Sequence, residues 1–117
     1  MSPLVLCVPS ANPDALVPEF VVRARATENH CFILWANPAG EDYCGRSTIV
    51  GPNGEILGAV NGKGEELLVV DLDVGHERYE TSRKMNPMLE WRRPELYEPI
   101  VAKDRLVKPS WPRDAHA

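Results

Sequence analysis

The sequence predicts a mixed α and β fold of the α+β class, with a βαβ opening, an antiparallel three-stranded segment and a C-terminal arm. Two short apolar runs, at residues 4–8 and 31–36, flank a segment with helical periodicity, as in a βαβ unit. Three apolar segments after residue 47 are separated by turns that contain Gly and Asn, which is typical of antiparallel hairpins. The prolines of residues 87–112 indicate an irregular C-terminal part.

The composition is that of an ordinary globular domain. The chain has 117 residues, of which 44% are hydrophobic and 26% charged. Its formal net charge of −4 argues against nucleic-acid binding, which requires a basic face. No apolar run approaches the roughly 20 residues that a membrane span needs, and residues 1–9 do not resemble a signal peptide. We therefore expect a cytoplasmic protein with no nucleic-acid or membrane partner.

The three cysteines, Cys7, Cys31 and Cys44, indicate neither a disulfide framework nor a metal site. Their odd number excludes a fully paired framework. They form no Cys-x-x-Cys motif and have no pair of histidines beside them, so we expect no metal and no other cofactor. Cys7 and Cys31 lie in apolar runs and are expected to be small buried hydrophobic residues.

The first two elements are a strand and a helix. Residues 4–8 predict a buried, central-type strand, which suggests that a further segment precedes it. The helix is expected to begin near Val17 or Pro18 and to end near Asn29. Its buried stripe, from the spacing of apolar residues, comprises Val17, Phe20, Val21 and Ala24. Arg25 and Glu28 are three residues apart on this helix, which favours an ion pair over acid–base machinery.

A second buried strand is predicted at residues 31–36, followed by a loop at 37–47 with Gly40 and Gly45 as its flexible points. Three antiparallel strands are then expected, at residues 48–50, 56–60 and 66–72. Beyond them the pattern indicates a short helix within 74–83 and one helical turn at 93–97. We expect residues 1–101 to form one structural unit and residues 102–117 a tail or arm.

Seven motifs along the chain resemble, in order and spacing, the C-terminal part of the nitrilase superfamily of carbon–nitrogen hydrolases. They cover residues 4 to about 100. The matching motifs are Val8-Pro9-Ser10-Ala11, Arg23-Ala24-Arg25-Ala26-x-Glu28-Asn29, Ala36-Asn37-x-x-Gly40, Gly45-x-Ser47-x-Ile49-Val50, Pro52-x-Gly54-Glu55, Asp71-Leu72-Asp73 and Arg92-Arg93-Pro94-Glu95-Leu96-Tyr97.

The resemblance implies an α-β-β-α sandwich that dimerises or assembles further. It also implies hydrolysis of a small amide or nitrile by a Glu, a Lys and a Cys, through a thioester on the cysteine. In the family this nucleophile precedes the strand that matches residues 4–9, and no counterpart of the triad is found here. The resemblance therefore predicts a truncated chain that is inactive alone. Its expected partner is either a complementing N-terminal segment or further copies of itself in a homo-oligomer.

Few residues remain as site candidates. By resemblance, Pro9, Ser10, Ala11 and Asn37 would form part of the substrate-pocket wall. The first three also suit a plain strand-to-helix turn, and Asn37 also suits a loop amide with no contact to a substrate. Cys44 lies in a loop beside Arg46, whose charge would lower a thiol pKa, so it is a candidate reactive thiol.

Two other readings of the chain stay open. One is a non-catalytic relative that binds a partner or forms an oligomer. The aromatic residues of the C-terminal region, Trp91, Tyr97 and Trp111, would suit such a contact. The other is an independent thiol enzyme that uses Cys44.

Overall fold

The structure is a computed structural model, and it describes residues 4–88 and 90–102. The chain divides into two compact units, Met1–Pro87 and Met88–Ala117. The sheet, the two longer helices and the candidate site all belong to the first unit. Among the described residues, none of the helices is both long and apolar enough to span a bilayer.

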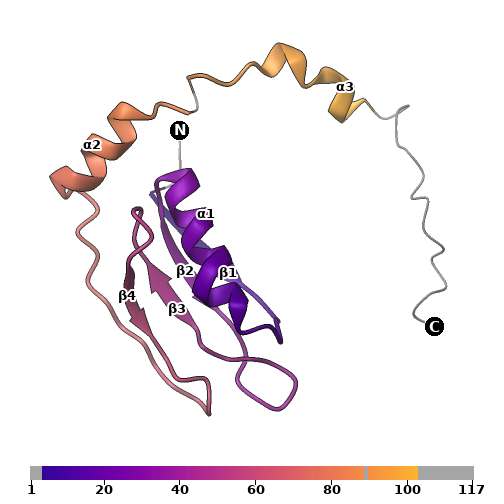
Figure 1. Cartoon of the computed structure of the whole chain (residues 1–117), viewed down its shortest axis with the longest axis vertical. Coiled ribbons are helices and arrows are strands. Elements are labelled where there is room, and N and C mark those ends of the chain that lie inside the picture. The colour runs from indigo at the N-terminus through magenta and orange to yellow at the C-terminus, as the bar shows by residue number, and fades with distance from the viewer. Residues whose placement is uncertain (1–3, 89, 103–117) are drawn as a thin grey trace. The chain divides into compact units, whose positions relative to one another are not determined.

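The first unit is built on a four-stranded sheet with the order β1-β2-β3-β4 (Figure 1). Its strands are β1 (Val5–Pro9), β2 (Phe32–Ala36), β3 (Thr48–Val50) and β4 (Ile56–Ala59). β1 and β2 are parallel, whereas the pairs β2–β3 and β3–β4 are antiparallel. The parallel pair is joined by a helix, so the predicted βαβ opening and the mixed α+β class are confirmed.

The position of β1 differs from its prediction as a buried central strand. It lies at an edge of the sheet, and Val5 and Leu6 are 37% and 42% exposed. Cys7 is likewise exposed and is not the buried hydrophobic residue that was expected. The apolar run at residues 4–8 specifies a strand, but the burial of a strand depends on its neighbours. Among the described residues only β2 pairs with β1, so the side chains of β1 are largely exposed.

The helix between β1 and β2 begins with a π-helical turn, η1 (Val17–Val21), and continues as α1 (Val22–Asn29). Pro18, Val22 and Ala26 are its buried residues, while Phe20 is 64% exposed. The predicted buried stripe was therefore wrong for Phe20, Val21 and Ala24. A π turn bonds i to i+5, so it rotates the helix face away from the regular spacing on which that prediction rested.

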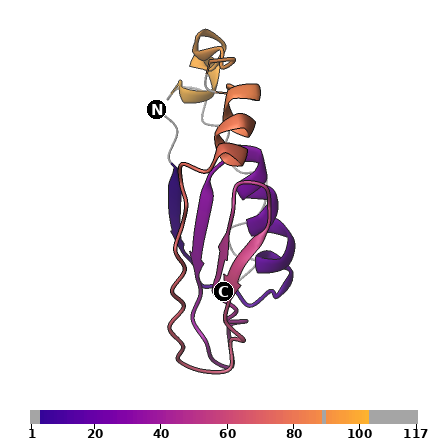
Figure 2. The same cartoon turned by 90° about the vertical axis from the view of Figure 1, so that its left-hand side faces the viewer.

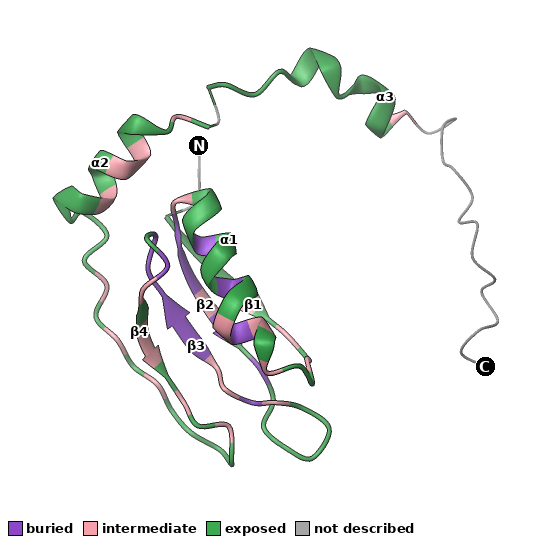
Figure 3. Ribbon diagram, viewed as in Figure 1, coloured by how far each residue is buried: buried purple, intermediate pink, exposed green. Residues whose placement is uncertain are grey.

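The core lies between α1 and one face of the sheet (Figures 2 and 3). Complete burial of an apolar side chain stabilises a fold by roughly 1.5–3 kcal/mol, so this cluster is the main source of stability. Its buried members are Val22, Ala26, Cys31, Ile33, Trp35 and Val50, with Val8, Val17 and Cys44 packed around them.

Residues 66–72 were predicted as a third antiparallel strand after β2, and this was wrong. The segment has an alternating burial pattern, but it is not a strand of the sheet. A Cβ on Gly58 of β4 would lie 2.9 Å from both Leu68 and Val70, so these side chains rest on the face of β4. That face is opposite to α1, because Gly58 pairs with Ile49 while the neighbouring Val50 belongs to the core.

The predicted short helix after residue 73 is confirmed as α2 (Glu77–Met85). The ring of Tyr79 packs edge-on against Phe32, with 5.1 Å between centroids, and its hydroxyl donates to Glu55 at 2.6 Å. Ser82 lies 3.0 Å from Nδ1 of His30. These contacts fix α2 to the sheet and to the end of α1.

The second unit contains η2 (Pro94–Leu96) and α3 (Glu98–Val101). The helical turn expected at 93–97 is therefore present. Trp91 is 64% exposed and Tyr97 is 44% exposed. Trp111, the third residue expected at a subunit contact, lies outside the described residues.

Candidate functional site at the carboxyl end of β2

Asn37, the first residue after β2, joins two loops at the end of the sheet. Its Oδ1 accepts a hydrogen bond from the backbone N–H of Asn12 at 2.7 Å, and its Nδ2 donates to the Asn12 carbonyl at 2.9 Å. Nδ2 also donates to the Gly45 carbonyl at 3.0 Å. Only 9% of the residue is exposed. Its amide therefore holds residues 10–14 and 37–47 together.

Ser47 closes the second loop onto the same residue. Its Oγ accepts from the Asn37 backbone N–H at 2.9 Å and donates to the Asn37 carbonyl at 3.2 Å. The loop 37–47 is thereby pinned at both ends, since β3 starts at the next residue, Thr48. A pinned loop presents its remaining groups in a fixed arrangement, which is what a binding site requires.

A third segment, residues 61–65, crosses this loop in direct backbone contact. Gly45 and Gly62 both have positive φ angles, 58° and 77°. A Cβ on Gly45 would lie 2.5 Å from Cα of Gly62, and a Cβ on Gly62 would lie 2.6 Å from the Cys44 carbonyl oxygen. Only glycine allows this approach, so the two glycines set how the segments cross.

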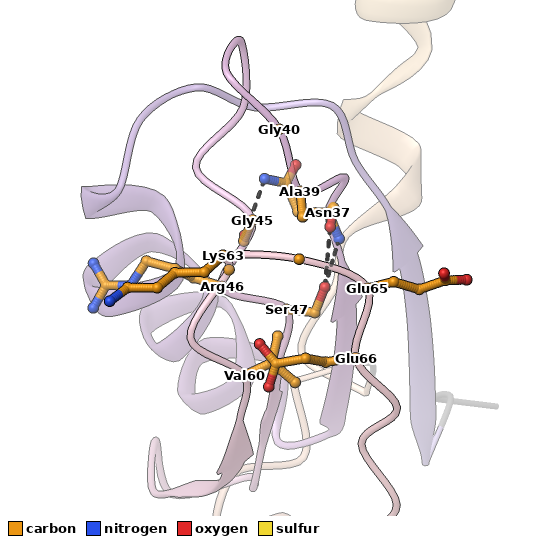
Figure 4. A pocket seen from close by; sticks show the side chains of 12 residues that line it. Asn37, Ala39, Gly40, Gly45, Arg46, Ser47, Val60, Lys63, Glu65 and Glu66 are labelled. Carbon is orange, nitrogen blue, oxygen red and sulfur yellow. Dashed lines mark hydrogen bonds between the residues drawn. The ribbon is translucent and has the colours of Figure 1, made fainter.

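The crossing loops line a half-open cavity of about 420 Å³ (Figure 4). Its wall combines two cationic and two anionic side chains with small residues. The lining residues are Asn37, Ala39, Gly40, Gly45, Arg46, Ser47, Val60, Gly62, Lys63, Gly64, Glu65 and Glu66. This volume is that of a site for a small molecule.

The residues predicted for a substrate pocket are only partly brought together here. Asn37 lines the cavity, whereas Pro9, Ser10 and Ala11 are not among its lining residues. The backbone N–H of Ser10 donates to the Ala36 carbonyl at 2.8 Å and so extends the pairing of β1 with β2. Contact of any of these four residues with a substrate stays a prediction.

The surroundings of Cys44 are those of a packed side chain. The residue is half-buried against the core, its Sγ lies 3.3 Å from Nδ2 of Asn37, and it is not a lining residue of the cavity. Arg46, the expected neighbouring cation, directs its guanidinium to Glu19, with Nη2 to Oε1 at 2.6 Å. The reactivity of Cys44 stays a prediction.

Two predictions about other candidate residues are confirmed. Cys31 is buried, and this burial raises the pKa of its thiol, an effect that the charge of Arg83 partly offsets. Arg25 and Glu28 form an exposed ion pair of 3.1 Å on α1. In the part of the chain that the structure describes, no group of three His, Cys, Asp or Glu side chains is arranged to hold a metal ion.

The charged wall of the cavity was missed from sequence. Arg46 lies near the end of the first loop, Lys63 and Glu65 belong to the turn before the predicted third strand, and Glu66 is the first residue of that predicted strand. Turn signals identify both segments, but nothing in their spacing says that they cross. The Gly45–Gly62 contact that brings them together is visible only in three dimensions.

Comparisons with known proteins agree with this arrangement. The family model "Carbon-nitrogen hydrolase" matches residues 11–79, which include α1, β2, the loop 37–47 and the cavity. A "Hydrolase in pqqF 5'region" of Pseudomonas protegens is 38% identical over 102 residues, covering 82% of this chain and 35% of that protein.

Two solved structures extend the likeness to the fold. Nit3 of Saccharomyces cerevisiae, a member of branch 10 of the nitrilase superfamily, superposes with a TM-score of 0.61 at 28% identity, over 77% of this chain and 35% of that one. An amidase mutant from Nesterenkonia sp. AN1 carries the acetamide moiety of fluoroacetamide covalently on its active-site cysteine. It superposes with a TM-score of 0.54 at 31% identity, over 75% of this chain and 35% of that one.

The chain thus spans about a third of the length of these relatives. The family match covers more than half of the chain and coincides with the elements that build the cavity. By this match and these relatives, the chain belongs to the carbon–nitrogen hydrolases of the nitrilase superfamily.

Proposed function

We propose that this chain is the C-terminal part of a carbon–nitrogen hydrolase that cleaves a small amide or nitrile with a cysteine nucleophile. The observation that carries the proposal is the family match over residues 11–79. This range includes β2 and the hydrogen-bonded loops that line the cavity at its end. The covalent cysteine adduct of the Nesterenkonia amidase supports the type of chemistry.

In the proposed reaction with an amide, a thiolate attacks the carbonyl carbon and a tetrahedral intermediate forms. The carbon–nitrogen bond then breaks, ammonia leaves with a proton from a general acid, and a thioester remains. Water hydrolyses the thioester to a carboxylic acid and regenerates the thiol. A base must activate the thiol and the water, and a cation must stabilise the developing oxyanion.

We propose that the Glu, Lys and Cys of this reaction are on a segment outside this chain, and that the chain alone is inactive. Cys44 is a poor alternative nucleophile, because the described contacts of its thiol are with Asn37 and with backbone carbonyls of Asp14 and Gly45. None of these groups is a general base. The chain's own role is then to hold the end of β2 and the cavity in place.

The proposed sandwich requires a second sheet, and residues 66–72 have the properties of a strand in it. They lie on the face of β4 opposite to α1. Their side chains alternate between exposed and half-buried, with Leu67 89% and Val69 78% exposed. Within the described residues, the backbone groups of 65–71 make no hydrogen bonds. A strand that is apolar on both faces and unpaired at both edges is suited to the inside of a sheet.

The charges around residues 66–72 favour the proposed N-terminal segment, and not a second copy of this chain, as the partner of these residues. Glu65, Glu66, Asp71 and Asp73 flank the apolar residues at both ends. In an antiparallel pair of two such segments centred on Val69, Glu65 would face Asp73 of the other copy, and like charges directly opposite are destabilising. A homo-oligomer that forms through another surface is compatible with this arrangement.

The test is reconstitution. The chain is purified alone and also with the N-terminal segment of the Pseudomonas protegens relative, and ammonia release from small aliphatic amides is measured. We expect no release from the chain alone and release from the mixture. Replacing the cysteine nucleophile of the added segment by alanine should abolish the release.

Two results would contradict the proposal. If the chain alone releases ammonia and Cys44→Ser abolishes this release, the chain is an independent thiol enzyme. If the two segments form a stable complex that releases no ammonia from any amide or nitrile, the second candidate function holds. That candidate is a non-catalytic binding module, and the exposed apolar residues of 66–72 favour it.

A further inference from the structure

We propose that α2 is a pH-dependent cover, which detaches from the end of the sheet in acid while the sheet itself stays folded. Detachment uncovers the side chain of Phe32 at the start of β2. The contacts of α2 lie outside the cavity, so the proposal is independent of the hydrolase function.

Helix α2 adds little to the buried core of the first unit. The structure describes it throughout, and none of its nine residues is buried. The core cluster consists instead of Cys31 and residues of α1, β2 and β3. A helix of fewer than about 12 residues is marginal in water, so α2 depends on its contacts with the rest of the unit. Loss of these contacts would open α2 locally and leave the core in place.

The carboxylate of Glu55 anchors the first turn of α2. Its Oε1 accepts hydrogen bonds from the Tyr79 hydroxyl at 2.6 Å and from Nη2 of Arg78 at 2.7 Å. Its Oε2 accepts from the backbone N–H of Asn53 at 3.0 Å, and a Cβ on Gly51 would lie 2.6 Å from its Cδ. The turn between β3 and β4 therefore holds the carboxylate in a fixed position toward α2. Protonation removes its charge, and with it the ion pair to Arg78.

The sign of the pH dependence follows from this anchor. Burial acts to raise the pKa of the Glu55 carboxyl, but the bonds from Tyr79 and the backbone, with the charge of Arg78, outweigh burial and hold the pKa below 4.5. Docking of α2 is therefore favoured above pH 4.5, and this contribution is lost as the pH falls through the lower pKa of the docked carboxyl. The bond to Glu55 also raises the pKa of Tyr79 above 10, so strong alkali weakens docking as well.

Two further titratable groups face this anchor from the turn before α2. His76 caps the helix, because its Nδ1 accepts from the backbone N–H of Arg78 at 3.2 Å. Its ring also lies beside that of Tyr79, with 5.6 Å between centroids. Protonation of Nδ1 removes the cap, so His76 acts in the same direction as Glu55. The charge of Asp73 acts on Tyr79 and adds to the rise of its pKa.

The contacts with α1 and its end do not depend on acid in this way. Arg23 donates from Nε to the Gly54 carbonyl at 2.6 Å, which ties the turn to α1 whatever the state of the carboxylate. At the other end of α2, Ser82 lies 3.0 Å from Nδ1 of His30. A hydroxyl can donate to a neutral imidazole and accept from a charged one. The acid-sensitive contacts are thus those at the N-terminal end of α2.

Detachment uncovers apolar surface at the end of the sheet where β2 begins, beside which α2 lies (Figure 1). Phe32 is 1% exposed, and the ring of Tyr79 packs against it. Phe32 pairs with Val5 of β1, and its N–H donates to the Leu4 carbonyl. Both of these neighbours are already exposed. Opening of α2 therefore extends the exposed apolar edge of β1 onto β2.

The test is hydrogen exchange of the isotope-labelled full chain, followed by nuclear magnetic resonance from neutral pH to below pH 4.5. The ratio of intrinsic to observed exchange rate gives the protection of each amide. Between pH 4.5 and the lower pKa of the docked carboxyl, the protection of α2 should fall about tenfold per pH unit. The amides of β2 and β3 should keep their protection. A soluble paramagnetic agent should reach the ring of Phe32 in acid but not at neutral pH.

Two variants assign the effect to Glu55. Glu55→Gln cannot titrate, so its α2 should be less protected than in the wild type at neutral pH and should lose little more in acid. Tyr79→Phe keeps the ring against Phe32 but removes the donor to the carboxylate, so the loss of protection should be shallower. The protection of β2 and β3 shows in each case that the sheet is folded.

Two further variants are the controls. His76→Asn keeps a capping side chain without a titrating one, and it should retain the loss of protection below pH 4.5. Glu80→Gln removes a carboxylate of α2 that pairs only with Lys84 in an exposed ion pair among the described residues, and it should behave as the wild type does.

The inference is overturned if α2 and the sheet lose protection at the same pH, because acid then unfolds the unit as a whole. It is also overturned if α2 keeps its protection in acid, or if Glu55→Gln and Tyr79→Phe retain the pH dependence of the wild type. A loss that only His76→Asn abolishes would reject Glu55 as the anchor. Exchange is measured without turnover, so its outcome is separate from that of the proposed hydrolysis.

Discussion

Gly45 is the residue on which the geometry of the cavity depends most. A side chain there would require φ near 58° and would place Cβ 2.5 Å from the backbone of Gly62. A left-handed conformation alone costs a non-glycine residue about 1–2 kcal/mol, and the clash adds to it. We expect Gly45→Ala to lower the free energy of unfolding by at least about 2 kcal/mol in urea denaturation. Gly64→Ala is the control, because its Cβ meets open space, and equal losses for both variants would contradict this account.

Glu55 makes the stability of the first unit depend on pH. Its burial alone would raise the pKa of the carboxyl, but hydrogen bonds from Tyr79 and from the backbone, with the charge of Arg78, hold the pKa below its ordinary value of 4.5. A lowered pKa stabilises the fold above the unfolded value, and this contribution is lost as the pH falls through the folded pKa. We therefore expect the free energy of unfolding to fall as the pH drops below about 4.5.

The variant Glu55→Gln tests this assignment, because it cannot titrate. It should be less stable than the wild type at neutral pH and should show a shallower decline of stability in acid, measured by urea denaturation at a series of pH values. Glu28→Gln removes an exposed ion pair with Arg25 and is the matched control. A decline in Glu55→Gln as steep as that of the wild type would assign the acid sensitivity to other groups.

At the scale of elements, the π turn before α1 decides which residues face the core. Val22 is 4% exposed and Phe20 is 64% exposed, although the sequence spacing favours Phe20 as the buried residue. We expect Val22→Ala to lower the free energy of unfolding by roughly 1–3 kcal/mol, because it leaves a cavity under the helix. Phe20→Ala should change it by less than about 0.5 kcal/mol. The opposite ranking in urea denaturation would place the helix in the register that the sequence predicted.

Other elements were predictable to the extent that their signals are local. The apolar run of β2 and the turn residues around β3 and β4 specify strands wherever they pack, so these three strands were predicted correctly. The segment 66–72 was predicted as a strand of the sheet, and it is not one. Its lack of a pairing partner was not predictable, because pairing depends on chain segments far away. The same reason explains why Asn37 was a candidate from sequence while Arg46 and Lys63 were not: their proximity results from the crossing at Gly45 and Gly62.

At the scale of the whole molecule, the first unit has one covered face and one open face. Helix α1 covers one side of the sheet, while residues 66–72 lie alone on the other side (Figure 2). Single exposed apolar side chains are normal in stable proteins, but here Leu67 and Val69 stand together on a backbone without hydrogen-bond partners among the described residues. The proposed N-terminal segment would pair with this backbone and cover these two side chains.

This complementation predicts separate effects on folding and on assembly. The double variant Leu67→Lys, Val69→Lys should change the free energy of unfolding by less than about 0.5 kcal/mol, because both side chains are exposed in the chain alone. The same variant should no longer bind the N-terminal segment, since assembly would bury two charges without partners. Size-exclusion chromatography with light scattering measures the binding. Leu16→Lys, at a residue 56% exposed before η1, is the control and should bind as the wild type does. Undiminished binding by the double variant would show that the segment docks elsewhere.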